Sequence, residues 1–182
     1  DKELLDSVNE KLKSLLGLEI FIENTRSKFE EEIDTRLYEV RVGKSRKDAI
    51  LPLPDVGFGI SQVLPLLTSI KSNKTLVIEE PESNLHPKAQ ANLIEDILIS
   101  HRKGDPRGGN ILMETHSEHF LVRILQLLEE GEIDDEDVAL IFVSTTEEDG
   151  TIAKRIRTKD GLLLDEIPES FLHLDNHTNS LI

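Results

Sequence analysis

Hydrophobic and polar positions follow two different patterns along the chain. In residues 1–16, leucines and one valine recur at helical spacing, which predicts an amphipathic helix that stops at Gly17. Residues 18–23 and 36–42 predict two short strands, and the second alternates apolar with polar side chains. The first fifty residues therefore predict a helix followed by a β-pair with one face in water.

From residue 51 onward the pattern changes to strands separated by helices. Three short apolar runs predict strands buried on both faces, at 75–78, 111–113 and 138–143. Segments with helical periodicity precede or separate them, at 59–70, 87–100 and 118–128. Strands joined by helices pair in parallel through right-handed crossovers. The predicted class is α/β: a mainly parallel sheet with flanking helices, with an added edge strand at 152–156.

Composition excludes several kinds of function. The 182 residues hold 36 acidic and 21 basic side chains, a net charge of −15, so the chain is not expected to bind nucleic acid by itself. It has no cysteine, which excludes disulfides, thiol catalysis and cysteine-based zinc sites. No apolar run approaches the roughly 20 residues of a membrane helix, and residues 1–4 do not open a signal peptide. We expect a cytoplasmic protein with no membrane partner.

Polar and charged residues stand where two of the predicted strands end. Glu79 and Glu80 end one strand, and Thr115 and His116 end the next. Because the carboxyl ends of parallel strands meet at one edge of a sheet, these side chains are expected to lie together. Two carboxylates beside a histidine suit Mg²⁺ binding, water activation and phosphate sensing. The alternative is that the strand ends are polar only because they reach water.

A loop with two glycines precedes the helix predicted at 59–70. Gly57 and Gly59 allow close approach to the backbone, and the first helical turn has free N–H groups that can bind an anion. Short glycine-containing loops also simply start helices. Both interpretations stay open on the residues alone.

In their order along the chain, these segments resemble the C-terminal half of an ABC-type ATPase, as in SMC, RecF and overcoming-lysogenization-defect (OLD) proteins. The matching segments are the signature loop at 56–62, Walker B at 76–81, the D-loop at 82–87 and the switch strand at 111–117. The Glu-Glu-Pro-Glu-x-x-Leu-His-Pro pattern is similar to that of predicted bacterial ATPases, which include OLD-like and PtuA-like anti-phage proteins. The resemblance covers residues 50–175, including the tail at 165–171.

This resemblance implies ATP and Mg²⁺ as cofactors and ATP hydrolysis as the activity of the complete protein. Glu79 would hold Mg²⁺, Glu80 would orient or deprotonate the attacking water, and His116 would sense the γ-phosphate. Phosphoryl transfer needs mostly positioning and charge neutralisation, which these residue types can supply.

The resemblance also implies a homodimer closed around nucleotide. The signature loop of one subunit would cap the nucleotide held by the other, through Gly57, Phe58, Gly59 and Ser61. The D-loop would place Asn84 and His86 at the dimer seam.

Three residues depart from the pattern of the superfamily. Glu79 stands where most members have Asp, Gly57 where the signature usually has Ser, and His86 where the D-loop usually has Asp. These departures fit a divergent branch and leave the rate of hydrolysis open.

A larger departure is the missing P-loop, which has the form Gly-x-x-x-x-Gly-Lys-Ser/Thr between a strand and a helix. Gly43-Lys44-Ser45 is the nearest match, but Tyr38 occupies the first glycine position and residues 46–54 show no helical pattern. Walker A is therefore expected upstream. Residues 1–50 then belong to an incomplete N-terminal part, residues 51–182 form the signature, Walker B and switch lobe with a C-terminal extension, and this chain alone is expected to be inactive.

Three functional hypotheses result. The first is the C-terminal lobe of a homodimeric ABC-type ATPase in bacterial DNA maintenance or anti-phage defence, with a nucleic acid or nuclease partner for the complete protein. The second is a non-hydrolysing interaction or assembly lobe of a defence or DNA-repair complex. The third is a Mg²⁺-dependent nuclease that uses Glu79, Glu80 and the acidic residues 134–137, but these acids precede their strand and are expected at the opposite edge of the sheet.

Overall fold

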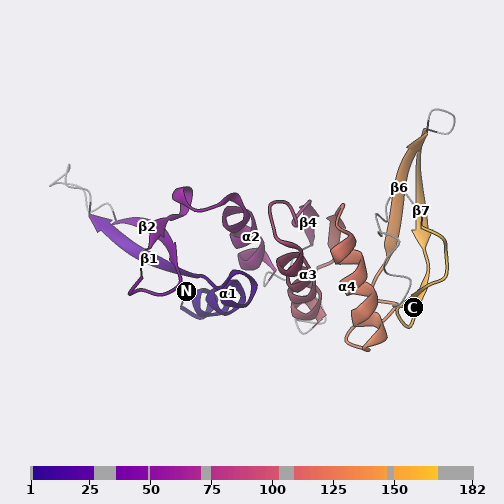
Figure 1. The fold of residues 1–182 in the computed structure, drawn as a ribbon, viewed down its shortest axis with the longest axis horizontal. Coiled ribbons are helices and arrows are strands. Elements are labelled where there is room, and N and C mark those ends of the chain that lie inside the picture. The colour runs from indigo at the N-terminus through magenta and orange to yellow at the C-terminus, as the bar shows by residue number, and fades with distance from the viewer. Residues whose placement is uncertain are drawn as a thin grey trace.

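A computed structural model describes residues 2–26, 36–48, 50–70, 75–102, 109–146 and 150–167. The helices are α1 (Lys2–Leu16), α2 (Phe58–Ser69), α3 (Pro87–Arg102) and α4 (Glu118–Glu129), with a short 3₁₀ turn, η1 (Leu53–Asp55). The strands are β1 (Glu19–Arg26), β2 (Arg36–Gly43), β3 (Leu51–Pro52), β4 (Leu76–Glu79), β5 (Ile111–Glu114), β6 (Leu140–Thr146), β7 (Gly150–Ile156), β8 (Thr158–Lys159) and β9 (Leu162–Leu163). The elements follow one another in a row, from β1 and β2 at one end to the β6–β7 hairpin at the other (Figure 1).

The helix and β-pair predicted for the first fifty residues are confirmed. β1 and β2 are antiparallel, and β3 extends the sheet. Arg41 pairs with Glu23 and Glu39 on the polar face, at 3.2 and 3.0 Å. That face is not entirely in water, however, because Phe21 lies on it, is buried, and is covered by the guanidinium of Arg46 at 5.6 Å.

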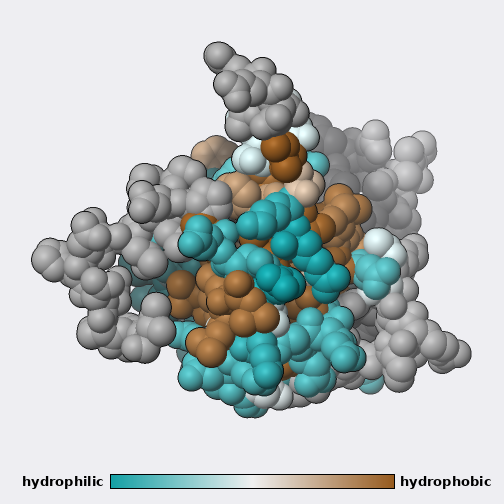
Figure 2. Space-filling model, turned by 90° about the vertical axis from the view of Figure 1, so that its right-hand side faces the viewer, coloured by the Kyte–Doolittle hydropathy of each residue, from teal (hydrophilic) through white to brown (hydrophobic). Residues whose placement is uncertain are grey.

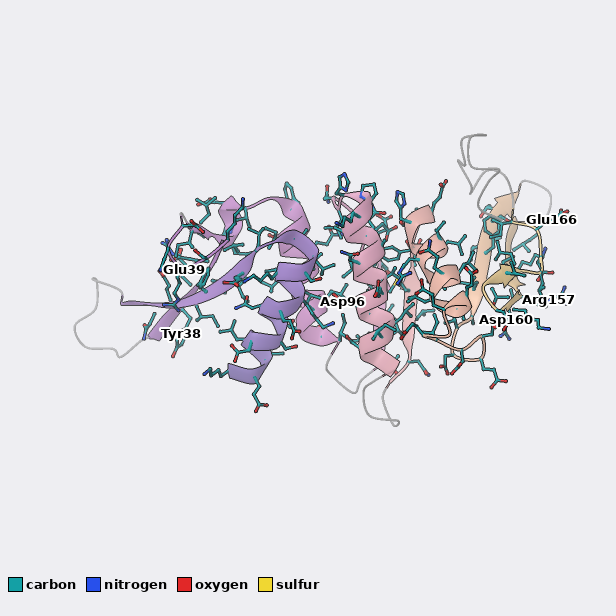
Figure 3. All side chains as sticks on the ribbon, turned by 60° about the horizontal axis from the view of Figure 1, so that its bottom comes forward. Tyr38, Glu39, Asp96, Arg157, Asp160 and Glu166 are labelled. Atoms are coloured by element: carbon teal, nitrogen blue, oxygen red, sulfur yellow. The ribbon has the colours of Figure 1, made fainter. Side chains whose placement is uncertain are left out.

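The core lies among the four helices. α3 packs against α1 and α4, and Lys11 of α1 bonds to Asp96 and Ser100 of α3 at 3.1 and 2.6 Å. Figure 3 labels Asp96 on this side of α3. The most deeply buried side chains are aliphatic apart from one phenylalanine: Val8, Leu12, Val63, Leu67, Leu93, Ile94, Ile97, Phe120 and Leu127.

The α/β class is confirmed, but the prediction of a mainly parallel sheet is wrong for the part of the chain that the structure describes. There, β4 and β5 form the one parallel pair, and the other pairings are antiparallel. The apolar run at 138–143 becomes β6, which pairs with β7. A short link joins these two strands, and short links form hairpins, whereas parallel pairing needs a long crossover.

The prediction that these strands are buried on both faces is also wrong. Ile111, Met113 and Leu140 pack against the helical core, whereas the alternate residues point away from it. Val77 is 69% exposed and Leu112 62% exposed. Apolar surface is visible among polar side chains where the molecule is viewed from the β6–β7 end (Figure 2). The helices cover one face of β4 and β5 and leave the other open.

The last described segment folds back onto α4. Gly161, at φ +78°, approaches so closely that an added Cβ would lie 2.5 Å from the carbonyl oxygen of Leu125.

The loop after α4 contacts the same segment through Asp135. Its carboxylate accepts hydrogen bonds from the Thr158 hydroxyl and the Asp160 amide, at 2.5 and 2.9 Å, and these bonds lower the pKa of the Asp135 carboxyl. Asp160 is labelled at this end of the molecule in Figure 3.

An ion pair between an exposed arginine and a partly buried aspartate closes the same segment. Arg157 donates to both carboxylate oxygens of Asp165, at 3.0 and 2.8 Å, and hydrogen bonds from Arg157 lower the pKa of Asp165 well below its usual range. The predicted family-like tail at 165–171 extends past residue 167 and lies largely outside the described residues. Within the described part, none of the helices has the length and apolar character needed to cross a membrane.

Candidate functional site

The ends of β4 and β5 form one edge, because the two strands are parallel and in register. Glu79 pairs with Glu114, and the amide of Glu80 donates to the carbonyl of Glu114 at 3.0 Å. The two strands are therefore neighbours, as the sequence predicted. Glu79 and Glu114 are both exposed and share a face of the sheet. A role for Glu114 could not be predicted, because the register that puts it beside Glu79 cannot be read from the sequence.

Glu80 and His116 lie close together at this edge. Nε2 of His116 is 3.8 Å from Oε1 of Glu80, and the side chains are 74% and 54% exposed. The Ser83 hydroxyl donates to the other oxygen of Glu80 at 3.1 Å. Glu80 has φ +44°, a left-handed conformation that is strained for a residue with a side chain and that clusters at functional sites. The chain thus turns sharply at the residue whose carboxylate lies 3.8 Å from the imidazole of His116.

The first turns of α2 lie on the segment that follows Glu80. Gln62 donates to the carbonyl of Glu80 at 3.1 Å and accepts from the amide of Asn84 at 3.4 Å. Gly59 is so near that an added Cβ would lie 3.0 Å from the carbonyl oxygen of Asn84. Gln62 therefore attaches the signature-like helix to the segment that follows β4, and its role could not be read from the sequence.

The remaining residues of the signature-like loop face outward. Gly57 caps α2 without a side chain, Phe58 is 81% exposed, and Ser61 is exposed. Their backbone N–H groups belong to the start of a helix, which favours an anion. The structure does not bring these residues into the pocket beside Glu80 and His116.

The D-loop-like residues lie between the site and α3. Asn84 has φ +61° and is exposed. His86 is also exposed, and its carbonyl accepts from the amide of Gln90 at 3.0 Å, so it stands at the start of α3. Both positions are accessible from outside the subunit.

Beneath the exposed pair lies a buried polar network that the sequence did not predict. Glu82 is 8% exposed, and its Oε1 accepts from the backbone amide of His116 at 2.7 Å. Gln90 donates to the carbonyl of Leu85 at 3.0 Å and accepts from the hydroxyl of the buried Ser117 at 2.6 Å. The sequence gives no signal for this network, because glutamate and glutamine usually lie at the surface.

Exposed and buried residues together line an open pocket of about 360 Å³. Its lining is polar: Glu80, Glu82, Ser83, Gln90, His116, Ser117, Glu118 and His119. Among the described residues, no group of three or more His, Asp or Glu side chains is arranged to hold a metal ion. Glu79 and Glu114 still offer the carboxylate oxygens that Mg²⁺ prefers. None of the acidic residues 134–137 lines the pocket.

Comparison with protein families matches residues 2–123 to the family described as "AAA domain, putative AbiEii toxin, Type IV TA system". This chain belongs to that AAA family. The match includes all the candidate site residues of this AAA domain, from Gly57 to His116. No curated protein matches the chain.

The AAA domain also has the fold of SMC ATPase heads. A structure from a study of ATP-driven dimerization and DNA-stimulated activation of SMC ATPases has a TM-score of 0.56 at 13% identity, over 87% of this chain and 85% of that one. The Pyrococcus furiosus Smc head bound to the C-terminal domain of ScpA has a TM-score of 0.58 at 12% identity, over 86% of this chain and 35% of that one.

A third structure agrees with these two. The Smc head of Pyrococcus yayanosii, with a coiled coil and joint, has a TM-score of 0.56 at 13% identity, over 87% of this chain and 27% of that one. The AAA domain thus spans about a third or less of the two longer Smc chains. Together the comparisons place the chain in this AAA family and confirm the resemblance to ABC-type ATPases at the level of the fold. The closer likeness to OLD-like and PtuA-like proteins stays a prediction.

Proposed function

We propose that this AAA domain is the lobe of a dimeric ABC-type ATPase that carries the Walker B, D-loop and switch residues, and that the complete protein hydrolyses ATP. The observation that carries the proposal is the approach of Glu80 and His116 to 3.8 Å at the ends of two neighbouring parallel strands. At this spacing the carboxylate can act on the attacking water while the imidazole contacts the γ-phosphate that is transferred.

Glu80 is the residue proposed to orient the attacking water. The Ser83 hydroxyl engages one of its carboxylate oxygens, which leaves Oε1 to accept a hydrogen bond or a proton from water. His116 can donate from Nε2 to an oxygen of the γ-phosphate. Both side chains are more than half exposed, so a nucleotide can reach them from outside the subunit.

Glu79 is the residue proposed to hold Mg²⁺, with Glu114 beside it on the same face. When bound, Mg²⁺ neutralises charge on the β- and γ-phosphate oxygens. Glu79 is one methylene longer than the Asp of most superfamily members, and the open face of β4 and β5 gives its side chain space to extend.

The site on this chain is half of a nucleotide site. After β2 ends at Gly43, residues 44–48 form turns and bends rather than a helix, so Gly43-Lys44-Ser45 lacks the geometry of a P-loop. We assign the Walker A cradle to sequence upstream, residues 1–50 to the incomplete N-terminal part, and residues 51–182 to the lobe described above. Among the described residues β5 pairs on one edge only, so its other edge is open to a further strand.

The outward-facing start of α2 supports a second subunit as partner. Gly57, Phe58, Gly59 and Ser61 lie outside the pocket of their own subunit, so they are proposed to cap a nucleotide held by the other one. Asn84 and His86 would lie at the same seam. The SMC structure compared above comes from a study of ATP-driven dimerization. Bacterial DNA maintenance or anti-phage defence, in the cytoplasm, is the proposed setting.

The test is ATP hydrolysis by the complete protein and by its Glu80→Gln variant. Removing a general base costs about 10²–10⁴-fold in rate, so the variant should lose hydrolysis, keep Mg·ATP binding, and form an ATP-dependent dimer in light scattering. Glu95→Gln is the matched control, because Glu95 lies on α3 in an ion pair with Arg123, outside the pocket.

Unchanged hydrolysis in Glu80→Gln would contradict the proposal and favour the assembly-lobe hypothesis. Phosphodiester cleavage without ATP would favour the nuclease hypothesis instead.

A further inference from the structure

We infer that Glu82 is a positioning residue for His116: it holds the backbone of the histidine, and through it couples the turn that carries Asn84 and His86 to the γ-phosphate sensor. This inference rests on the proposed ATPase function of the site. Glu82 is buried in the wall of the pocket, and its effect on the reaction passes through His116.

The contact that carries the inference joins the segments that follow β4 and β5. Oε1 of Glu82 accepts from the backbone N–H of His116 at 2.7 Å, across 34 residues of chain. Hydrogen bonds to an ionised group are shorter and roughly twice as strong as neutral ones. The imidazole of His116 is 74% exposed, so little packing holds it. Its distance from Glu80 therefore depends on where the backbone of His116 is fixed.

A second link ties the same two segments on the far side of His116. Gln90 donates to the carbonyl oxygens of Leu85 and Glu82, at 3.0 and 3.4 Å. Its own oxygen accepts from the hydroxyl of Ser117 at 2.6 Å. The turn at 80–86 and the loop at 115–117 are thus bonded at two places, and a displacement of one displaces the other.

Stability does not explain a carboxylate at this position. Oε2 of Glu82 is buried and has no hydrogen-bond partner among the described residues. Burying an unpaired carboxylate oxygen is costly, and replacing a buried charged group by a neutral one of similar volume is often stabilising. A glutamate at 82 is better explained by the amide that it holds than by the free energy of folding.

The consequence concerns communication within the dimer. Asn84 and His86 share the turn of Glu82, and the proposed function places them at the seam. Closing the seam would shift this turn, and Glu82 and Gln90 would carry the shift to His116. The γ-phosphate sensor would then reach its active position only in the closed dimer.

A double-mutant cycle in the complete protein tests the inference. A misplacement of about 1 Å can cost about 10²-fold in rate, so Glu82→Ala should lower kcat by about ten- to a hundredfold and leave KM for ATP within about twofold. Glu82→Gln, whose amide oxygen can still accept from the His116 N–H, should keep kcat within about threefold. In a His116→Ala background, Glu82→Ala should add less than about twofold.

Thermal unfolding of each variant separates positioning from folding, and Glu95→Gln again serves as the matched control. If Glu82→Ala fails to fold, Glu82→Asp enters the same cycle, since it keeps the charge and withdraws the oxygen from the amide. Losses that multiply in the double variant, or an unchanged kcat in the single one, would overturn the inference. If the wild-type protein does not hydrolyse ATP, or if the Glu80→Gln variant hydrolyses it at the full rate, the proposed function itself is contradicted.

Discussion

Replacing Gly161 by alanine tests how the last described segment is attached to α4. An added Cβ would lie 2.5 Å from the carbonyl oxygen of Leu125, and 2.8 and 2.9 Å from Cβ and N of Glu129. Two of these three atoms belong to the backbone of a helix, which cannot move aside as a flexible side chain can. Gly161 also has φ +78°, where a residue with a side chain is strained.

The magnitude follows from these two effects. The left-handed conformation costs about 1–2 kcal/mol for a residue with Cβ. Forcing a carbon into a filled site costs about 1–3 kcal/mol more. The variant should therefore lose about 2–5 kcal/mol of unfolding free energy. Gly131→Ala is the matched control: Gly131 has φ +70°, but an added Cβ there meets nothing within 4 Å, so about 1–2 kcal/mol is expected.

Urea unfolding followed by circular dichroism measures both variants against the wild type. The loss should be larger for Gly161→Ala than for Gly131→Ala by about 1–3 kcal/mol, the part due to the clash. Equal losses in the two variants would refute the close contact between Gly161 and α4. If the turn lifts off instead of straining, proteases should cut within 158–163 more readily in Gly161→Ala than in the control.

Two further predictions concern an ion pair and a helix cap. Because Arg157 lowers the pKa of Asp165 in the folded state, the stabilisation is present above the ordinary aspartate pKa of about 3.9 and is lost as the pH falls below it. The difference in urea midpoint between the wild type and Asp165→Asn should thus shrink from pH 7 to pH 2.5, and a constant difference would contradict this. Ser117 caps α4 by accepting from the amide of Phe120 at 3.2 Å, so Ser117→Ala should cost about 1–2 kcal/mol and speed hydrogen exchange at that amide, which NMR detects.

Elements with a strong local signal could be predicted from the sequence. α1 and α4 have clear apolar stripes, and each is found within two residues of its predicted bounds. The pairing of β6 could not be predicted, because an apolar run is compatible with both parallel and antiparallel pairing. The three residues between β6 and β7 are too few for a parallel crossover and decide for the antiparallel hairpin. The exposure of Val77 and Leu112 could not be predicted either, because burial depends on what covers a strand as much as on its own residues.

Some residues of the candidate site could be predicted from the sequence, and others could not. Glu80 and His116 could be placed together because polar residues at the ends of parallel strands meet at one edge. Glu79 lies at the same edge beside Glu114 but does not line the pocket. Glu114 needed the register of the two strands, and Glu82 needed the tertiary fold. A buried glutamate looks like any surface glutamate in a sequence, and only the amide that it accepts from sets it apart.

The two glycines before and within α2 predict different patterns of natural variation. Gly57 has φ −60° and open space around it, so the backbone admits serine or another small polar residue there. Gly59 meets the carbonyl oxygen of Asn84 and the side chain of Leu85, so any larger residue must push the turn that carries Glu80. In relatives of this chain the residue at position 57 should therefore vary, whereas glycine should be conserved at position 59, even in relatives that no longer hydrolyse the nucleotide.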